Sequence, residues 1–220
     1  MTVVRKLVAE GLGTAFLLAI VVGSGIMGEQ LAGGNDAVAL LANSIATGAG
    51  LGVLILVFGP ISGAHFNPVV TLVAAHRREL PPRLAALYVV TQIGGAYAGV
   101  ASAHLMFDLP LYTLSTHVRH GLGQWWSEFV ATFGLVLVIL SCMRHRPNVT
   151  PFAVAAYITS AYWFTASTSF ANPAVTLARA TTNTFSGIFP ADIFGFIVAQ
   201  VIGSVLSLHL FAWLFDRNQP

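Results

Sequence analysis

Two short Asn-Pro motifs hold the polar side chains whose types and spacing most clearly suggest chemistry. Asn67-Pro68-Val69 opens the run NPVVTL and Asn172-Pro173-Ala174 opens NPAVTL, so five of six positions agree at a separation of 105 residues. Pro suits the first position of a helix, where its missing N–H would have no partner. The preceding Asn caps such a helix with its side-chain oxygen. The amide NH2 groups of Asn67 and Asn172 then remain free to donate hydrogen bonds into the space between the motifs.

Two acidic residues stand inside long apolar segments and also repeat. Glu10 is followed four residues later by Thr14, and Glu128 is followed at the same spacing by Thr132. An ionisable residue within a membrane span is costly and commonly functional. We expect both carboxylates to accept hydrogen bonds from backbone N–H groups of the irregular segments that lead into the two motifs, because such groups need partners inside a membrane. A proton relay is the alternative.

The composition excludes several classes of protein. Only 18 of the 220 residues are charged, which is 8% against about 25% in soluble domains, and 56% are hydrophobic. A soluble enzyme is excluded, and so is a nucleic-acid binder, because the net charge is +2 and the basic residues are scattered. Cys142 is the single cysteine, and no histidines have ligand spacing, so we expect no metal and no cofactor. The chain is predicted to be an integral membrane protein in a lipid bilayer.

Six apolar segments are long enough to cross a bilayer, which needs about 20 residues. The first has a basic start like a signal peptide, but its length and its glutamate favour a retained span. Two further apolar segments, Phe66–Ala75 and Ala171–Ala180, are too short to span and predict re-entrant half-helices. The predicted spans are Leu7–Met27, Ala37–Gly59, Leu84–Phe107, Trp125–Met143, Thr150–Ser167 and Ile193–Phe215.

Basic residues beside the spans predict the orientation in the cell (inner) membrane. With the N-terminus inside, the outer side receives Arg119 and Arg179, and both termini are cytoplasmic. The inner side receives eight basic residues, namely Arg5, Lys6, Arg77, Arg78, Arg83, Arg144, Arg146 and Arg217.

The chain reads as one domain, residues 1–220, made of two repeats at about 1–110 and 120–220. Each repeat has a glutamate-bearing span, a second span, an Asn-Pro half-helix and a third span with Gln-x-x-Gly. Three spans per repeat is an odd number, so the second repeat enters the membrane from the opposite face. The N-terminal ends of the half-helices then meet near the midplane. Two positive dipole ends oppose a cation there and favour an uncharged hydrogen-bonding solute.

These motifs, with Ser62–Phe66 (SGAHF) before the first one, resemble the aquaporin and aquaglyceroporin family (major intrinsic proteins) over nearly the whole chain. The resemblance implies an all-α membrane protein of aquaporin-like fold, with six transmembrane helices and two re-entrant half-helices in an inverted repeat. It implies a homotetramer with a pore in each protomer. It also implies that Asn67 and Asn172 donate to solute and water passing in single file.

The chain departs from the family pattern at two positions. Val69 stands where the family has Ala, which is a modest change of volume where the half-helices pack together. Val175 stands where most members have an arginine that forms the charged wall of the outer selectivity filter.

Counting from the motifs, the remaining filter positions are Thr47, Ser160 and Ser169. With Val175 they are small and uncharged, which predicts a wide filter. The count for Ser160 assumes no gap, and an error of one turn would bring Trp163 or Phe164 to the pore instead. Such a filter resembles the branch of the family that passes larger uncharged solutes, including glycerol and the trihydroxides of metalloids such as arsenite and antimonite, with water still passing.

Two further residues are expected at the pore approaches. His65 either lines the cytoplasmic approach or is a satisfied structural histidine. Arg179, one turn beyond Val175 on the same helix face, either restores a positive charge at the outer mouth or is an interfacial arginine bonded to loop carbonyls. The sequence favours a passive channel over a secondary transporter, because the spans hold no additional acid or base to couple ions. No nucleophile–base or metal constellation indicates an enzyme, so no catalytic residue is expected.

Overall fold

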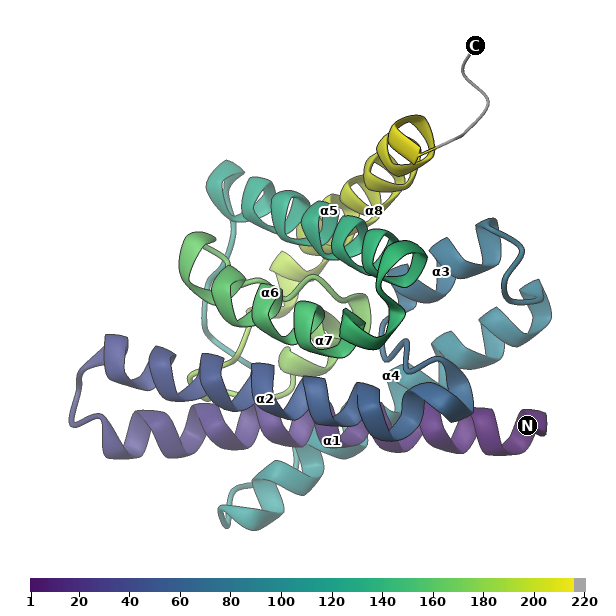
Figure 1. Ribbon diagram of the computed structural model, residues 1–220. Coiled ribbons are helices and arrows are strands. Elements are labelled where there is room, and N and C mark those ends of the chain that lie inside the picture. Colours follow the sequence, from purple (N-terminus) through teal and green to yellow (C-terminus); the bar gives the residue numbers. More distant parts are fainter. Residues whose placement is uncertain (216–220) are drawn as a thin grey trace.

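Eight α-helices and two short 310 helices make up most of residues 1–215, the part of the chain that the computed structural model describes (Figure 1). Arg217 and the end of the second repeat lie outside the described residues. The α-helices are α1 (Val3–Leu31), α2 (Asp36–Ser62), α3 (Pro68–His76), α4 (Pro82–Met106), α5 (Leu122–His145), α6 (Thr150–Phe164), α7 (Pro173–Arg179) and α8 (Ile193–Phe215). The 310 helices are η1 (Pro147–Val149) and η2 (Pro190–Asp192).

Five of the predicted spans form helices of sufficient length and apolar character to cross a membrane: α1, α2, α4, α5 and α8. The sixth, α6, has 15 residues and is about 22 Å long, against a hydrocarbon core of about 30 Å. It ends at Phe164, three residues before the predicted end, because Thr165 adopts an extended backbone (φ −112°, ψ 140°). The preceding η1 lengthens this segment on its other side. The predicted all-α membrane architecture is confirmed, with one span shorter than expected.

The two repeats use equivalent helix contacts. The most extensive contacts join α1 with α4 and with α2 in the first repeat and α5 with α8 in the second, and α2 lies against α6 where the halves meet (Figure 1). Each half-helix contacts the last span of the other repeat, α3 with α8 and α7 with α4. Gln92-x-x-Gly95 and Gln200-x-x-Gly203 explain how the spans approach so closely: a Cβ on Gly95 would lie 2.3 Å from the Gly11 carbonyl oxygen, and one on Gly203 would lie 2.5 Å from that of Phe129.

The two half-helices form where the Asn-Pro motifs predict them, but they begin later than their apolar segments. α3 begins at Pro68 and α7 at Pro173, because Phe66 (φ 49°) and Ala171 (φ 48°) have left-handed backbones that no helix continues. Such backbones are uncommon outside glycine and need support from the surrounding structure. Each half-helix therefore follows an irregular segment, and the conformation of that segment has to be stabilised by side chains from elsewhere in the chain.

Candidate functional site

The Asn-Pro motifs meet at the centre of the molecule through reciprocal hydrogen bonds. Asn67 Nδ2 donates to the Ala171 carbonyl oxygen at 2.7 Å, and Asn172 Nδ2 donates to the Phe66 carbonyl oxygen at 2.8 Å. The side-chain oxygens cap the half-helices, accepting from Val69 N at 3.1 Å in α3 and from the first N–H groups of α7. An amide NH2 has two hydrogens. Each asparagine therefore donates one amide hydrogen to the segment before the opposite half-helix, and its second amide hydrogen is available to another acceptor.

Glu10 supports the segment that leads into α3. Its Oε1 accepts from His65 N at 3.0 Å and from the Ser62 hydroxyl at 2.6 Å, and its Oε2 accepts from Phe66 N at 2.8 Å. Gln92 Nε2 donates to the same Oε2 at 2.8 Å. The fully buried carboxylate thus receives four hydrogen bonds, two of them from the backbone of the left-handed segment.

Glu128 does the same for the segment that leads into α7. Its two oxygens accept from Phe170 N at 2.8 Å and from Ala171 N at 2.9 Å, and Gln200 Nε2 donates at 2.6 Å. Gln200 also donates to Thr176 at 2.9 Å, as Gln92 does to Thr71 in the first repeat. The glutamines are functional partners that sequence reasoning did not assign, although their repetition was visible.

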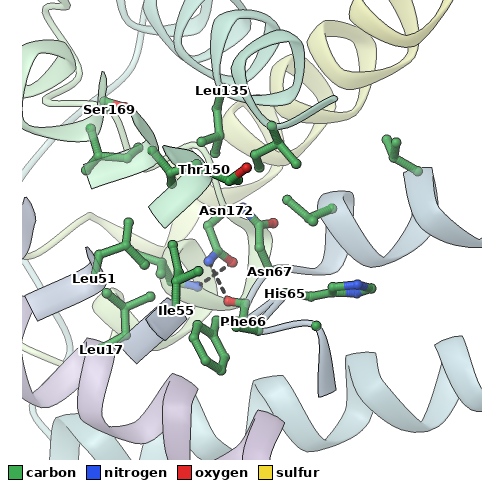
Figure 2. Close-up of a pocket in the computed structure, with 18 of the residues that line it drawn as sticks. Leu17, Leu51, Ile55, His65, Phe66, Asn67, Leu135, Thr150, Ser169 and Asn172 are labelled. Atoms are coloured by element: carbon green, nitrogen blue, oxygen red, sulfur yellow. Dashed lines mark hydrogen bonds between the residues drawn. The ribbon is translucent and has the colours of Figure 1, made fainter. Parts of the chain in front are cut away.

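A cavity of about 160 Å³ runs past the two asparagines (Figure 2). Its walls are largely apolar, as Figure 2 shows for Leu17, Leu51, Ile55 and Leu135. Asn67 and Asn172 both line it and are 5% exposed each. The residues that follow the asparagines are buried, namely Pro68 and Val69 in α3 and Pro173 and Ala174 in α7. The remaining amide hydrogen of each asparagine is therefore available to a passage whose walls are largely apolar.

Three of the four expected filter residues lie on this cavity. Thr47, Ser169 and Val175 line it and are nearly buried. The hydroxyl of Ser169 has no hydrogen-bond partner among residues 1–215, although it is buried. Thr47 accepts a hydrogen bond from the hydroxyl of Tyr162 at 3.3 Å.

The structure does not place Ser160, the fourth expected filter residue, on the cavity. Ser160 is exposed and donates to the Tyr157 carbonyl oxygen within its own helix. Val154, Ile158 and Tyr162 line the cavity from α6 at intervals of four residues, and a residue two positions from Tyr162 is turned about 200° away. Trp163 and Phe164, the alternatives, are 48% and 55% exposed and do not line it either. The four-residue spacing in α6 was the signal that could have identified Tyr162.

His65 stands in the irregular segment before α3. It lines the cavity, and its ring Nδ1 is 3.1 Å from the Thr71 hydroxyl. The ring meets Tyr88 edge-on at a centroid distance of 5.5 Å. His65 is thus both fixed in place and in contact with the passage (Figure 2).

Two arginines lie near the ring of Phe170. Arg179 is 2% exposed, lines the cavity, lies 3.4 Å above the ring centroid and donates through Nε to the Ser186 carbonyl oxygen. Arg119, from the segment between α4 and α5, lies 5.3 Å from the same centroid. Burial lowers the pKa of the Arg119 guanidinium, and Glu128 opposes that shift. Sequence reasoning did not bring Arg119 to this site.

Comparisons with known proteins agree with this geometry. Residues 1–164 match the family model described as major intrinsic protein. The chain is 56% identical over 216 residues to aquaglyceroporin AqpS of Rhizobium meliloti (strain 1021), covering 98% of this chain and 92% of the relative. It is 32% identical over 227 residues to aquaporin NIP2-1 of Zea mays, covering 98% and 73%. Its fold is similar to the aquaglyceroporin from Plasmodium falciparum, with a TM-score of 0.75, 21% identity and 98% of each chain covered.

Proposed function

The chain belongs to the major intrinsic protein family, and from that premise we propose which solutes it passes. Members of this family are channels, so the chain is a passive membrane channel for water and small uncharged solutes and not an enzyme. We propose that its solutes include molecules larger than water, namely polyols such as glycerol and the uncharged hydroxides of metalloids such as arsenite and antimonite.

The observation that carries this proposal is the side chain of Val175. It is 5% exposed on the wall of the cavity, at the position where the family usually has an arginine. Valine is much shorter than arginine and has no charge, which supports a wider and less polar passage at this level. The unpartnered hydroxyl of Ser169 and the hydroxyl of Thr47 line the same cavity, where they are available to a passing hydroxyl group.

The centre of the cavity supports an uncharged solute for a second reason. Asn67 and Asn172 present N–H donors where the N-termini of α3 and α7 meet, and both helix dipoles are positive at that end. A neutral hydroxyl gains a hydrogen bond there, whereas a cation loses its hydration and meets two positive ends.

The channel is also proposed to be a homotetramer in the inner membrane with both termini cytoplasmic. The excess of inner basic residues supports the orientation. An exposed apolar row on α1, formed by Val4, Val8, Leu12 and Phe16, needs lipid or a neighbouring protomer. Native mass spectrometry in detergent should give four chains per particle, and a monomer would contradict this assembly.

Val175→Arg tests the proposed solute range. The substitution places a long, permanently charged side chain beside Thr47 and Ser169, so bulk should exclude glycerol and arsenite more strongly than water. Stopped-flow measurements on proteoliposomes give the fluxes of water, glycerol and arsenite in one preparation. The glycerol-to-water and arsenite-to-water ratios should fall severalfold in Val175→Arg and stay unchanged in the isosteric control Val175→Thr.

Ratios within one preparation remove differences in expression and insertion. If the unmodified protein passes water but neither glycerol nor arsenite above protein-free vesicles, the proposed solute range is wrong. If the ratios are equal in Val175→Arg and Val175→Thr, Val175 does not limit solute size.

A further inference from the structure

Arg179 is a buried cation whose donors are only partly used. One face of its guanidinium lies on the Phe170 ring, at 3.4 Å from the centroid, and its Nε donates to the Ser186 carbonyl oxygen. Its terminal nitrogens Nη1 and Nη2 make no hydrogen bond to the rest of residues 1–215. Because the side chain is 2% exposed and lines the cavity, these nitrogens are left to donate into the passage.

Arg119 stabilises the surroundings of Arg179 by donating hydrogen bonds to three backbone carbonyl oxygens. Its Nε donates to the Gly187 carbonyl oxygen at 2.7 Å, and its terminal nitrogens donate to the carbonyl oxygens of Ser167 and Phe185 at 3.4 Å each. These bonds join the segment before α7 to the segment after it. Arg119 thereby fixes the Phe170 ring and the loop whose Ser186 carbonyl holds Arg179.

The positive charge at this end has no acidic counterpart in direct contact. Within residues 1–215, neither guanidinium forms a salt bridge. Asp192 accepts from the backbone N of Arg119 at 2.7 Å and lies 3.6 Å from His120, so its carboxylate is directed to other groups. This end of the passage therefore has two arginines without a salt-bridge partner among residues 1–215, one of them with free donors.

We propose that Arg179 is the charged, specificity-determining donor of the outer constriction, held in place by Phe170 and Arg119. This inference rests on the proposed function as a channel. Arg179 lies four residues after Val175 along α7, which displaces the charge by about 6 Å along the helix axis. The passage then keeps a positive barrier against cations, while Val175 leaves room beside it.

The charge of Arg179 and the space beside Val175 together define the class of solute. A solute has to offer acceptor oxygens to the Arg179 donors and an uncharged body to the space beside Val175. Uncharged molecules with two or more hydroxyl groups meet both requirements. Inorganic cations and protons meet neither, because the guanidinium repels them before they reach the asparagines.

Arg179→Met tests the charge while keeping most of the side-chain length. In proteoliposomes with an imposed potential, sodium and proton permeability should rise on the order of 100-fold, as removal of a nearby unit charge in a partly desolvated site predicts. Water flux should change little. The matched control is Arg144→Met, because Arg144 also lies near aromatic rings, those of Phe211 and Phe215, but at the other end of the molecule. It should show no cation leak.

A second substitution asks whether charge at this level is what matters. Adding Val175→Arg to Arg179→Met returns an arginine one turn lower on α7, so cation exclusion should return while glycerol flux falls. If Arg179→Met and Arg144→Met have the same cation permeability in a channel that passes glycerol, the proposal for Arg179 is overturned. If the unmodified chain passes no uncharged solute at all, it is the proposed function that fails.

If Arg179→Met does not insert into the membrane, Arg179→Lys tests whether the Arg179 donors contact solute. Lysine keeps the charge but loses the planar fork that stacks on Phe170 and donates through Nε. Cation exclusion should remain, and the glycerol-to-water flux ratio should change severalfold. An unchanged ratio would show that the Arg179 donors do not contact solute and would overturn the proposal.

Discussion

Each asparagine at the centre of the molecule divides its amide among three tasks. The oxygen caps its own half-helix, one amide hydrogen bonds to the opposite half-helix, and the other hydrogen faces the cavity. Asn67 and Asn172 therefore join the two repeats through the same amide groups that line the cavity. Aspartate retains the capping oxygen and loses both amide hydrogens, so an Asn-to-Asp substitution separates the donor role from the capping role.

Asn172→Asp should abolish or strongly reduce solute flux. The new carboxylate loses the 2.8 Å hydrogen bond to the Phe66 carbonyl oxygen and places a negative charge against that oxygen. Glycerol and water fluxes in proteoliposomes provide the measurement. The matched control is Asn148→Asp in η1, which is exposed and away from the cavity, and should behave as the unmodified protein. Undiminished flux through a correctly inserted Asn172→Asp channel would contradict the donor role.

Tyr162→Val should raise the glycerol-to-water flux ratio severalfold. The aromatic ring of Tyr162 lines the cavity and its hydroxyl reaches Thr47 at 3.3 Å, so a smaller side chain widens the same level of the passage. Ser160→Val, on the outward face of the same helix, should leave the ratio unchanged. The opposite outcome, with Ser160→Val the active substitution, would return the filter to the position counted from the sequence.

Local features of residues were readable from the sequence and long-range ones were not. Capping by Asn67 and Asn172 depends on the next few residues, and a glutamate in an apolar span needs internal donors wherever it lies. The position of Tyr162 depends on which face of α6 meets α2 and α5, and the position of Arg119 depends on the path of a loop. Both positions are set by contacts between segments that are distant in the sequence, and counting residues from a motif gives no information about such contacts.

At the scale of elements, the half-helices depend on the spans that contact them. α3 and α7 are too short to be stable alone, and each begins after a left-handed residue. Glutamates in α1 and α5, and glutamines in α4 and α8, supply the hydrogen bonds that hold these segments. The long helices therefore serve as the scaffold, and close contact between them is a condition for the site.

Gly95→Ala should destabilise the protein by about 1–3 kcal/mol, the usual cost of overpacking. Its Cβ would lie 2.3 Å from the backbone oxygen of Gly11, and backbone cannot turn aside as a flexible side chain can. Thermal unfolding in detergent is the measurement. The adjacent control Gly94→Ala meets nothing within 4 Å and should leave the unfolding temperature unchanged or slightly higher. Equal unfolding temperatures would contradict the close α1–α4 contact.

Element boundaries were less predictable than element identity. Hydropathy located each span, but α1 and α2 extend several residues beyond the apolar segments, since helical hydrogen bonding continues into flanking polar residues. α6 ends early instead, where the Thr165 hydroxyl bonds back to the Ala161 carbonyl oxygen and the chain turns toward the filter. Hydropathy therefore predicts which segments lie in the membrane, whereas local hydrogen bonding determines the residue at which each helix ends.

At the scale of the molecule, nothing in the described structure couples solute movement to a second ion. Glu10 and Glu128 are the buried acids within the long helices of residues 1–215, and each carboxylate accepts hydrogen bonds from backbone and glutamine donors. An ion-coupled transporter needs a carboxylate or a similar group that is free to bind and release its ion. The inverted repeat, which channels and transporters share, here surrounds one fixed passage.

Solute flux should therefore be passive in every respect that separates a channel from a transporter. Glycerol flux into proteoliposomes should rise in proportion to its gradient without saturating at moderate concentration, and it should be equal in the two directions. It should also be independent of an imposed membrane potential or proton gradient, because an uncharged solute crosses without a coupled ion. Counterflow of labelled glycerol is the sharpest measurement, since a carrier accelerates exchange and transiently accumulates label against its gradient. Accumulation of unmodified glycerol above the external concentration would contradict the passive channel.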